Sequence, residues 1–397
     1  MSPDLPFDVI AQIIDIVGEN KDTELLKRLA LVSHSFLQIC SKHLFATVIL
    51  KGADPEYRIP SSKKGFVKLL RSRPDVVKYI RTLMYQVRDE YDNRPLSISQ
   101  SSTHPSESED DPILLNLLRT ISRLNCLIII ASLQDWNTLD SSLTSALLHL
   151  MHLPTVNHID LSYIKNFPMS SLTPCVNLHR LDISDLRSGS PEIVVPLEMM
   201  PKIREFHVLD SSRVTTKLLH AKTQDGRPAF NFMDLRLFLI SLNRFEDEQI
   251  VRYLLQNAKL LEKLHLILRR SLVGLLSPSA HTLKVLDLTV SLYDPVPVLA
   301  GVSEELEAMA GHNMLESLSL EVYAGVHNTE DLIGPLIQKV ENVLVKPGWS
   351  ALRQVSFKVS VLGRITPKLL EALQSLPDKY LSQLSKLESV AFSYSVR

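Results

Sequence analysis

The residues whose spacing best fits a metal site are His149 and His152, three positions apart in a leucine-rich segment. Two imidazoles one turn apart on a helix can bind the same zinc ion, but such a site needs further ligands. No acidic residue or cysteine lies beside this pair. We therefore expect the two histidines to be structural and the chain to bind no metal.

The other common arrangements for catalysis are missing from the sequence. No serine lies in a Gly-x-Ser-x-Gly turn, and Cys175 follows a proline in a segment typical of a loop. The chain has 12 glycines, and none of them belongs to a phosphate-binding loop. We expect a protein that is not an enzyme and has no cofactor. The alternative is an enzyme whose site is assembled from distant residues.

Composition excludes several classes of protein. The 397 residues include 43 Lys and Arg against 44 Asp and Glu, so a field that attracts nucleic acid is not expected. The three cysteines have no paired spacing, which argues against disulfides and favours a reducing compartment. The segment 1–6 does not resemble a secretory signal, and the apolar runs are too short to cross a membrane. These features predict a cytoplasmic or nuclear protein, or both, with no membrane partner.

The first fifty residues have apolar side chains at helical spacing, which predicts three short helices. We expect the first to begin near Pro6 and to stop at a left-handed Gly18, and Asp22 and Ser33 to cap the other two. The β-branched segment 45–50 favours a strand. So small a unit buries little of its apolar surface, which points to a partner. The alternative is that these are the first helices of a larger core.

Four segments of this region closely resemble the F-box of many fungal proteins: 5–10 (LPFDVI), 13–14 (II), 29–36 (LALVSHSF) and 43–45 (HLF). That family is a three-helix module that docks on the Skp-family adaptor of cullin-RING ubiquitin ligases. Two positions depart from the family pattern, since Asp8 stands where Glu is usual and Phe45 stands near the usual Trp. The resemblance implies that the core of the module and its adaptor-binding surface are shared among Leu5, Pro6, Asp8, Ile10, Ile13, Leu29, Val32 and Phe36.

After a connecting region at 51–90, which contains a first repeat-like strand, residues 91–111 are rich in Ser, Pro and acidic residues and predict a flexible loop. Within 112–397 an apolar residue is followed repeatedly by others three and five positions later, as in Leu261, Leu264 and Leu266. We expect one such triplet at Phe232, Leu235 and Leu237. Helix-like segments separate most of these strands, for example 246–258 and 366–376.

This alternation resembles the leucine-rich repeat family, in which parallel strands form a concave face and helices lie outside. The sequence therefore predicts an α/β fold, a three-helix F-box module at 1–50 followed by an irregular repeat solenoid. The Asn that usually follows each strand is absent, and residues such as Ile164, Leu186 and Tyr323 stand in its place. An ordinary α/β sheet domain is the alternative.

Strand residues that alternate with the apolar ones should face the concave surface. The candidates for contacts with a client protein are Asp160, Arg180, Asp182, His207, Arg236, Phe238, Lys263, His265 and Asp287. The resemblances together imply a substrate receptor of a cullin-RING (SCF-type) ubiquitin ligase, which binds a Skp-family adaptor and an unknown protein client. The alternative is a protein-binding scaffold that acts without the ligase.

Overall fold

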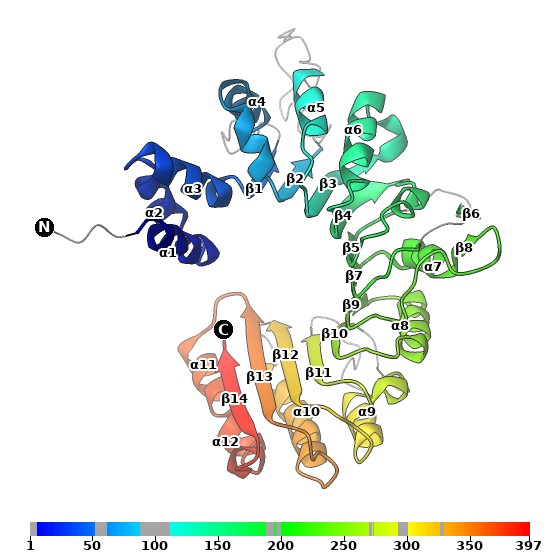
Figure 1. Cartoon of the computed structure of the whole chain (residues 1–397). Coiled ribbons are helices and arrows are strands. Elements are labelled where there is room, and N and C mark those ends of the chain that lie inside the picture. Colours follow the sequence, from blue (N-terminus) through cyan, green and yellow to red (C-terminus); the bar gives the residue numbers. More distant parts are fainter. Residues whose placement is uncertain are drawn as a thin grey trace, which may run out of the picture. The chain divides into compact units, whose positions relative to one another are not determined.

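The computed structural model describes residues 6–51, 62–87, 112–187, 194–195, 200–269, 272, 274–292, 301–325 and 329–397. The predicted loop at 91–111 and the predicted adaptor-binding residue Leu5 lie outside these ranges. The chain divides into two compact units, Met1–Pro201 and Lys202–Arg397. Both combine strands with helices in an α/β arrangement (Figure 1).

In the first unit, five strands pair side by side in sequence order, and all of these pairs are parallel. The strands of this unit are β1 (Thr47–Leu50), β2 (Thr82–Gln86), β3 (Cys126–Asp135), β4 (His158–Lys165), β5 (Arg180–Ser184) and the short β6 (Val194–Val195). Its helices are α1 (Phe7–Glu19), α2 (Thr23–Ala30), α3 (His34–Leu44), α4 (Ser62–Ser72), α5 (Pro112–Arg119) and α6 (Ser141–Met151), with 3-10 turns η1 (Pro74–Tyr79), η3 (Trp136–Thr138) and η4 (Met169–Leu172).

In the second unit, β7 and β9 to β14 also pair in sequence order, again in parallel. The strands are β7 (Glu205–Leu209), β8 (Lys222–Thr223), β9 (Leu237–Leu242), β10 (Lys263–Leu268), β11 (Val285–Ser291), β12 (Ser317–Gly325), β13 (Gln354–Leu362) and β14 (Ala391–Val396). The helices are α7 (Ser212–His220), α8 (Phe245–Asn257), α9 (Val302–Met309), α10 (Thr329–Leu344), α11 (Pro367–Gln374) and α12 (Leu376–Tyr380), with 3-10 turns η5 (Ser277–Ser279) and η6 (Leu384–Lys386).

The helices that connect the strands lie on one face of the sheet in each unit (Figure 1). We call the opposite face of each sheet its open face. Along β10, β11 and β12, fully buried residues alternate with half-buried ones. This alternation is the period-two pattern of a strand with one face in the core and one toward water. The buried triplet Leu261, Leu264 and Leu266 confirms the predicted spacing.

The predicted triplet at Phe232, Leu235 and Leu237 is wrong by three residues. The buried residues with this spacing are Leu235, Phe238 and Ile240, and Leu237 is only half-buried. Phe238 pairs in register with the buried Leu264 of β10. The prediction that Phe238 faces the concave surface is therefore also wrong, because its ring is fully buried and stacks 6.0 Å from the ring of Phe206.

The three N-terminal helices form as predicted, and two of their caps are confirmed. Leu25 N–H donates to Asp22 Oδ1 over 3.0 Å, and Phe36 N–H donates to Ser33 Oγ over 3.3 Å. The predicted stop at Gly18 is wrong, because α1 continues to Glu19. Gly18 instead leaves room for His43: a Cβ at this position would lie 2.2 Å from the His43 Nδ1 atom.

In the second unit, buried carboxylates on helices accept hydrogen bonds from backbone N–H groups of the loops. Glu341 of α10 accepts from Gln383 N over 2.9 Å and from Leu384 N over 3.0 Å. Glu305 of α9 accepts from Leu276 N over 2.8 Å, and also from Gly274 N. Backbone amides in the interior need acceptors, and these carboxylates supply them.

Changing Glu341→Ala should remove two of these bonds and leave the Gln383 and Leu384 amides without this acceptor. We expect the free energy of unfolding of the second unit to fall by about 2 kcal/mol. Urea denaturation of the full chain, followed by Trp349 fluorescence in a Trp136→Phe background, measures this change. Glu371→Ala, at an exposed position on α11, is the matched control and should shift stability by less than ~0.5 kcal/mol. Equal effects of the two substitutions would contradict the role given to Glu341.

Candidate functional site

Three side chains on the open face of the first unit form a continuous hydrogen-bonded chain. Cys126, His158 and Asp182 come from the adjacent strands β3, β4 and β5. The Cys126 Sγ atom lies 3.1 Å from His158 Nδ1, and His158 Nε2 lies 3.0 Å from Asp182 Oδ2. A carboxylate can only accept, so Nε2 carries a hydrogen and donates it to Asp182. The thiol and the imidazole therefore meet through Nδ1.

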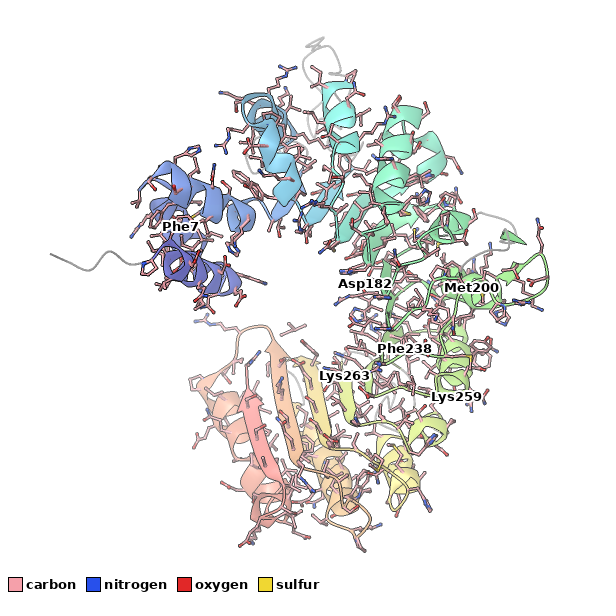
Figure 2. The ribbon with its side chains drawn as sticks, in the orientation of Figure 1. Phe7, Asp182, Met200, Phe238, Lys259 and Lys263 are labelled. Atoms are coloured by element: carbon pink, nitrogen blue, oxygen red, sulfur yellow. The ribbon has the colours of Figure 1, made fainter. Side chains whose placement is uncertain are left out.

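Charged neighbours complete this group. Arg180 donates to Asp182 through Nε and through a terminal nitrogen, over 3.1 and 2.9 Å. Ser162 Oγ donates to Asp160 Oδ1 over 2.8 Å. Figure 2 labels Asp182 on the sheet of the first unit. The predicted candidates Asp160, Arg180 and Asp182 thus lie together on neighbouring strands.

The surroundings shift the proton affinities of this group in a consistent direction. Burial opposes the protonation of His158, but its hydrogen bonds to Asp182 and Cys126 outweigh burial and raise its pKa to about 9. Burial, with the nearby charge of Asp182, raises the pKa of Asp160 above its ordinary value. At neutral pH His158 is therefore cationic, with Nε2 directed at the Asp182 carboxylate and Nδ1 at the Cys126 sulfur.

The open face of the second unit carries a separate set of polar side chains. Lys263 Nζ on β10 lies 3.3 Å from Asp287 Oδ2 on β11, and His265 Nε2 lies 3.1 Å from Thr289 Oγ1. Burial lowers the pKa of His265 below its ordinary value, although Asp287 opposes the shift. Figure 2 labels Lys263 on this sheet. At neutral pH this face therefore combines a neutral imidazole with an ion pair.

The other two predicted client-binding residues lie apart from these pairs within the second unit. His207 is half-buried on β7, in register with Leu239 of β9, which is in turn in register with His265. Arg236 is exposed and directly precedes β9. Of the nine predicted residues, Phe238 is fully buried, Asp182 is buried with 9% exposure, and the other seven are half-buried or exposed.

Cys126 and His158 were missing from the predicted site residues. Each of them directly precedes the first buried residue of its strand, Leu127 in β3 and Ile159 in β4. Aligning these strands on their buried residues places Cys126 beside His158, as the observed ladder does. That alignment is the sequence signal that could have found the pair.

The predicted adaptor-binding residues on the three N-terminal helices divide into two groups. Ile10, Leu29 and Phe36 are half-buried and pack against the small core of Ile14, Leu26 and Cys40. The exposed members are Pro6, Asp8, Ile13 and Val32. Phe7, labelled on α1 in Figure 2, is 52% exposed.

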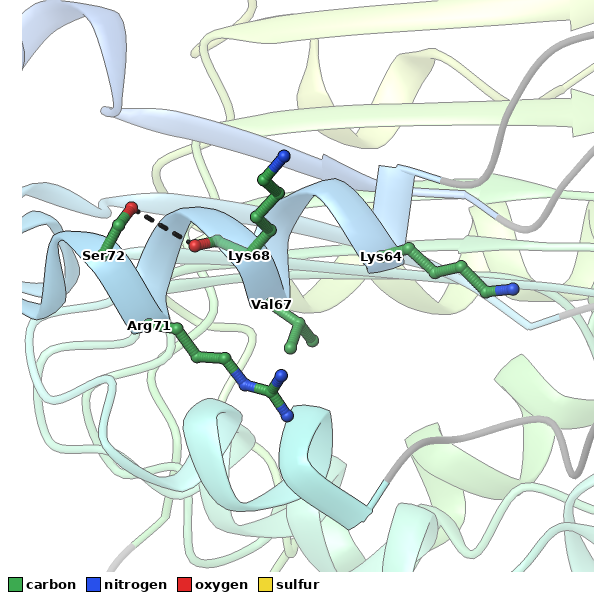
Figure 3. Close-up of a pocket in the computed structure, with 5 residues that line it drawn as sticks. All are labelled: Lys64, Val67, Lys68, Arg71 and Ser72. Carbon is green, nitrogen blue, oxygen red and sulfur yellow. Dashed lines mark hydrogen bonds between the residues drawn. The ribbon is translucent and has the colours of Figure 1, made fainter.

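A shallow hollow lies beside α4 and is lined by Lys64, Val67, Lys68, Arg71 and Ser72 (Figure 3). The Ser72 hydroxyl donates to the Lys68 carbonyl oxygen over 3.2 Å and to that of Leu69 over 2.9 Å. These bonds hold the hydroxyl against its own helix, and the lining supplies no acid or base pair of the kind found in the Cys126 group. We assign no chemistry to this hollow.

Neither known protein-family models nor curated protein sequences gave a match to this chain. Among the residues that the structure describes, no group of three or more His, Cys, Asp and Glu side chains is arranged to hold a metal ion. Within the same ranges, no helix has both the length and the apolar character needed to cross a bilayer. The function must therefore be argued from the chain's own surfaces.

The pKa of His158 provides a direct test of the Cys126 group. We expect a titration midpoint near 9 in NMR of selectively labelled histidines, against an ordinary value of 6.5. Because the folded-state pKa is raised, protonation of His158 stabilises the folded state below pH 6.5, and this contribution is lost as the pH rises through about 9.

Asp182→Asn should lower the pKa of His158, since burial then acts with less opposition. Asp287→Asn makes the same charge change on the open face of the second unit and should leave the midpoint of His158 in place. An unshifted midpoint in Asp182→Asn would show that the carboxylate does not hold the imidazole in its charged form.

Proposed function

We propose that this chain is a substrate receptor of a cullin-RING ubiquitin ligase, with α1–α3 as an F-box module that binds a Skp-family adaptor. The observation that carries the proposal is the exposure of large apolar side chains on these three helices and their turns. Those more than one-third exposed are Phe7, Val9, Ile13, Ile16, Leu25, Leu31 and Val32. Leu31 is 87% exposed and Val32 is 65% exposed.

Helix α1 is apolar on two sides. Ile10, Ile14 and Val17 turn toward the core of the module, at the spacing of one helical stripe. Val9, Ile13 and Ile16 repeat that spacing one residue earlier, and they face solvent. A helix with apolar residues well beyond its core-facing stripe is suited to burial by a second surface.

The identity of that second surface comes from the sequence resemblance. The segments that resemble the F-box contain Ile14 of the small core and also the exposed Ile13 and Val32. Under this proposal Ile13 and Val32 are buried by the adaptor, while Ile14, Leu26 and Cys40 keep the module folded.

The client would bind on the open faces of the sheets, which we interpret as the concave side of a degenerate leucine-rich repeat array. The strands pair in sequence order, and the connecting helices lie on one face of each sheet. Both features support a repeat array over an ordinary α/β sheet domain. Mixed charges such as Arg180, Asp182, Lys263 and Asp287 suit a protein surface better than a single small anion. In this proposal the ligase partners perform ubiquitin transfer, and the chain acts by holding the client near them.

Adaptor binding can be tested with the full chain and a purified Skp-family adaptor. The double change Ile13→Ala and Val32→Ala should weaken binding about 30-fold or more, because truncating central apolar anchors costs ~2 kcal/mol or more. Isothermal titration calorimetry measures the affinity. Both side chains are exposed, so the fold should be retained, as circular dichroism can verify.

Leu260→Ala and Met314→Ala are the matched controls, since these side chains are 46% and 52% exposed in the second unit. They should leave the affinity unchanged within about twofold. A wild-type chain that forms no complex with the adaptor would overturn the proposal and favour a scaffold that acts without the ligase.

A further inference from the structure

The strand ladder of the first unit brings a nucleophile, a base and a carboxylate into contact. Cys126 and His158 are direct partners in the β3–β4 register, and Asp182 lies on β5, the next strand. Their contacts are 3.1 Å from sulfur to Nδ1 and 3.0 Å from Nε2 to the carboxylate. This is the order of groups that activates a thiol: a base beside the sulfur and an acid group that orients the base.

The proton of the Cys126 thiol has a defined acceptor. Asp182 holds the hydrogen on Nε2, so in neutral His158 the Nδ1 atom is the acceptor that faces Cys126. Transfer of the thiol proton to Nδ1 produces a thiolate beside an imidazolium, and Asp182 stabilises that cation. Arg180, in register with His158 on β5, adds a second positive charge to the group.

The described neighbours on the other side of Cys126 do not compete for this proton. On β2 the residues that pair with Cys126 and Ile128 are Thr82 and Met84, neither of which titrates near neutral pH. The titratable and charged groups that face the pair therefore come from β4 and β5: Asp160 beside His158, and Arg180 and Asp182. Among these, only Asp182 bonds directly to the imidazole.

Cys126 also differs from the other two cysteines in access. Its side chain is partly exposed on the open face, while Cys40 and Cys175 are buried. Burial raises the pKa of the Cys40 thiol, and it raises that of Cys175 to about 12. Two inert thiols in the same chain therefore provide an internal reference.

We propose that Cys126, activated by His158 and Asp182, is a covalent modification site that reacts with small hydroperoxides. The thiolate sulfur attacks the hydroxyl oxygen of the peroxide, so an S–O bond forms as the O–O bond breaks. Sulfur is oxidised to a sulfenic acid and the peroxide is reduced. The departing alkoxide or hydroxide takes the Nδ1 proton of His158 and leaves as an alcohol or water.

We assign Cys126 no acyl-transfer reaction in addition to this modification. Acyl-transfer catalysis needs amide donors for an oxyanion, and the nucleophile's own N–H commonly serves in that role. Cys126 N–H instead donates to the Arg81 carbonyl oxygen over 3.0 Å within the sheet. The inference is independent of adaptor binding.

Alkylation of the full chain with iodoacetamide, followed by peptide mass spectrometry, tests whether the thiol is activated. At pH 7 Cys126 should react about tenfold faster than a cysteine in a short peptide. His158→Gln and Asp182→Asn should slow the reaction. A wild-type rate no faster than that of the peptide, or a rate unchanged by His158→Gln, would overturn the proposal.

Hydrogen peroxide with dimedone trapping tests the class of reagent. Sulfenic acid should form at Cys126, and neither Cys40 nor Cys175 should be labelled. Fast alkylation without a sulfenic acid would overturn the assignment to peroxides. Labelling of Cys40 and Cys175 in the His158→Gln or Asp182→Asn variant would show that this variant has unfolded, and the wild-type alkylation rate then decides the question alone.

Discussion

In-register pairing between parallel strands determines which side chains become neighbours in both units. Each strand presents alternate residues to the open face, and the ladder aligns them across strands whatever the length of the connection. Cys126 and His158 are 32 residues apart in the sequence, yet they are direct partners on β3 and β4. A shift of one residue in β4 would turn His158 into the core and Ile159 toward water. The polar group on the open face therefore depends on the same buried residues that hold the strands in place.

This dependence explains which parts of the structure could be predicted from the sequence. Buried residues three and five positions apart identify individual strands, and Asp22 and Ser33 identify two helix starts, because both signals are local. Phe232, Leu235 and Phe238 are all buried, so two overlapping triplets fit the same segment and the spacing alone cannot choose between them. Gly18 was misassigned for a different reason, because the close approach of His43 comes from a helix that is distant in the sequence.

The buried carboxylates were beyond sequence reasoning as well. Glu341 lies on an amphipathic helix, where a glutamate normally indicates the solvent face. Its partners are the backbone amides of Gln383 and Leu384, 42 and 43 residues later in the chain. No local sequence pattern marks a glutamate that accepts hydrogen bonds from amides so far along the chain. Because the acceptors for these loop amides are carboxylates on helices, charged groups lie in the interior. Each of these carboxylates accepts several hydrogen bonds there.

The two kinds of exposed surface differ in what a partner gains by covering them. The apolar side chains of α1 have no interaction to give up except with water, so their burial is favourable for almost any complementary apolar surface. The charged groups on the open face of the first unit are already bonded to one another, so a partner there must match an existing arrangement.

Oxidation of Cys126 would change that arrangement directly. It changes the group at the sulfur, which forms one of the two contacts that raise the pKa of His158. A partner that recognises the paired charges of Asp182, Arg180 and His158 would then meet a different surface.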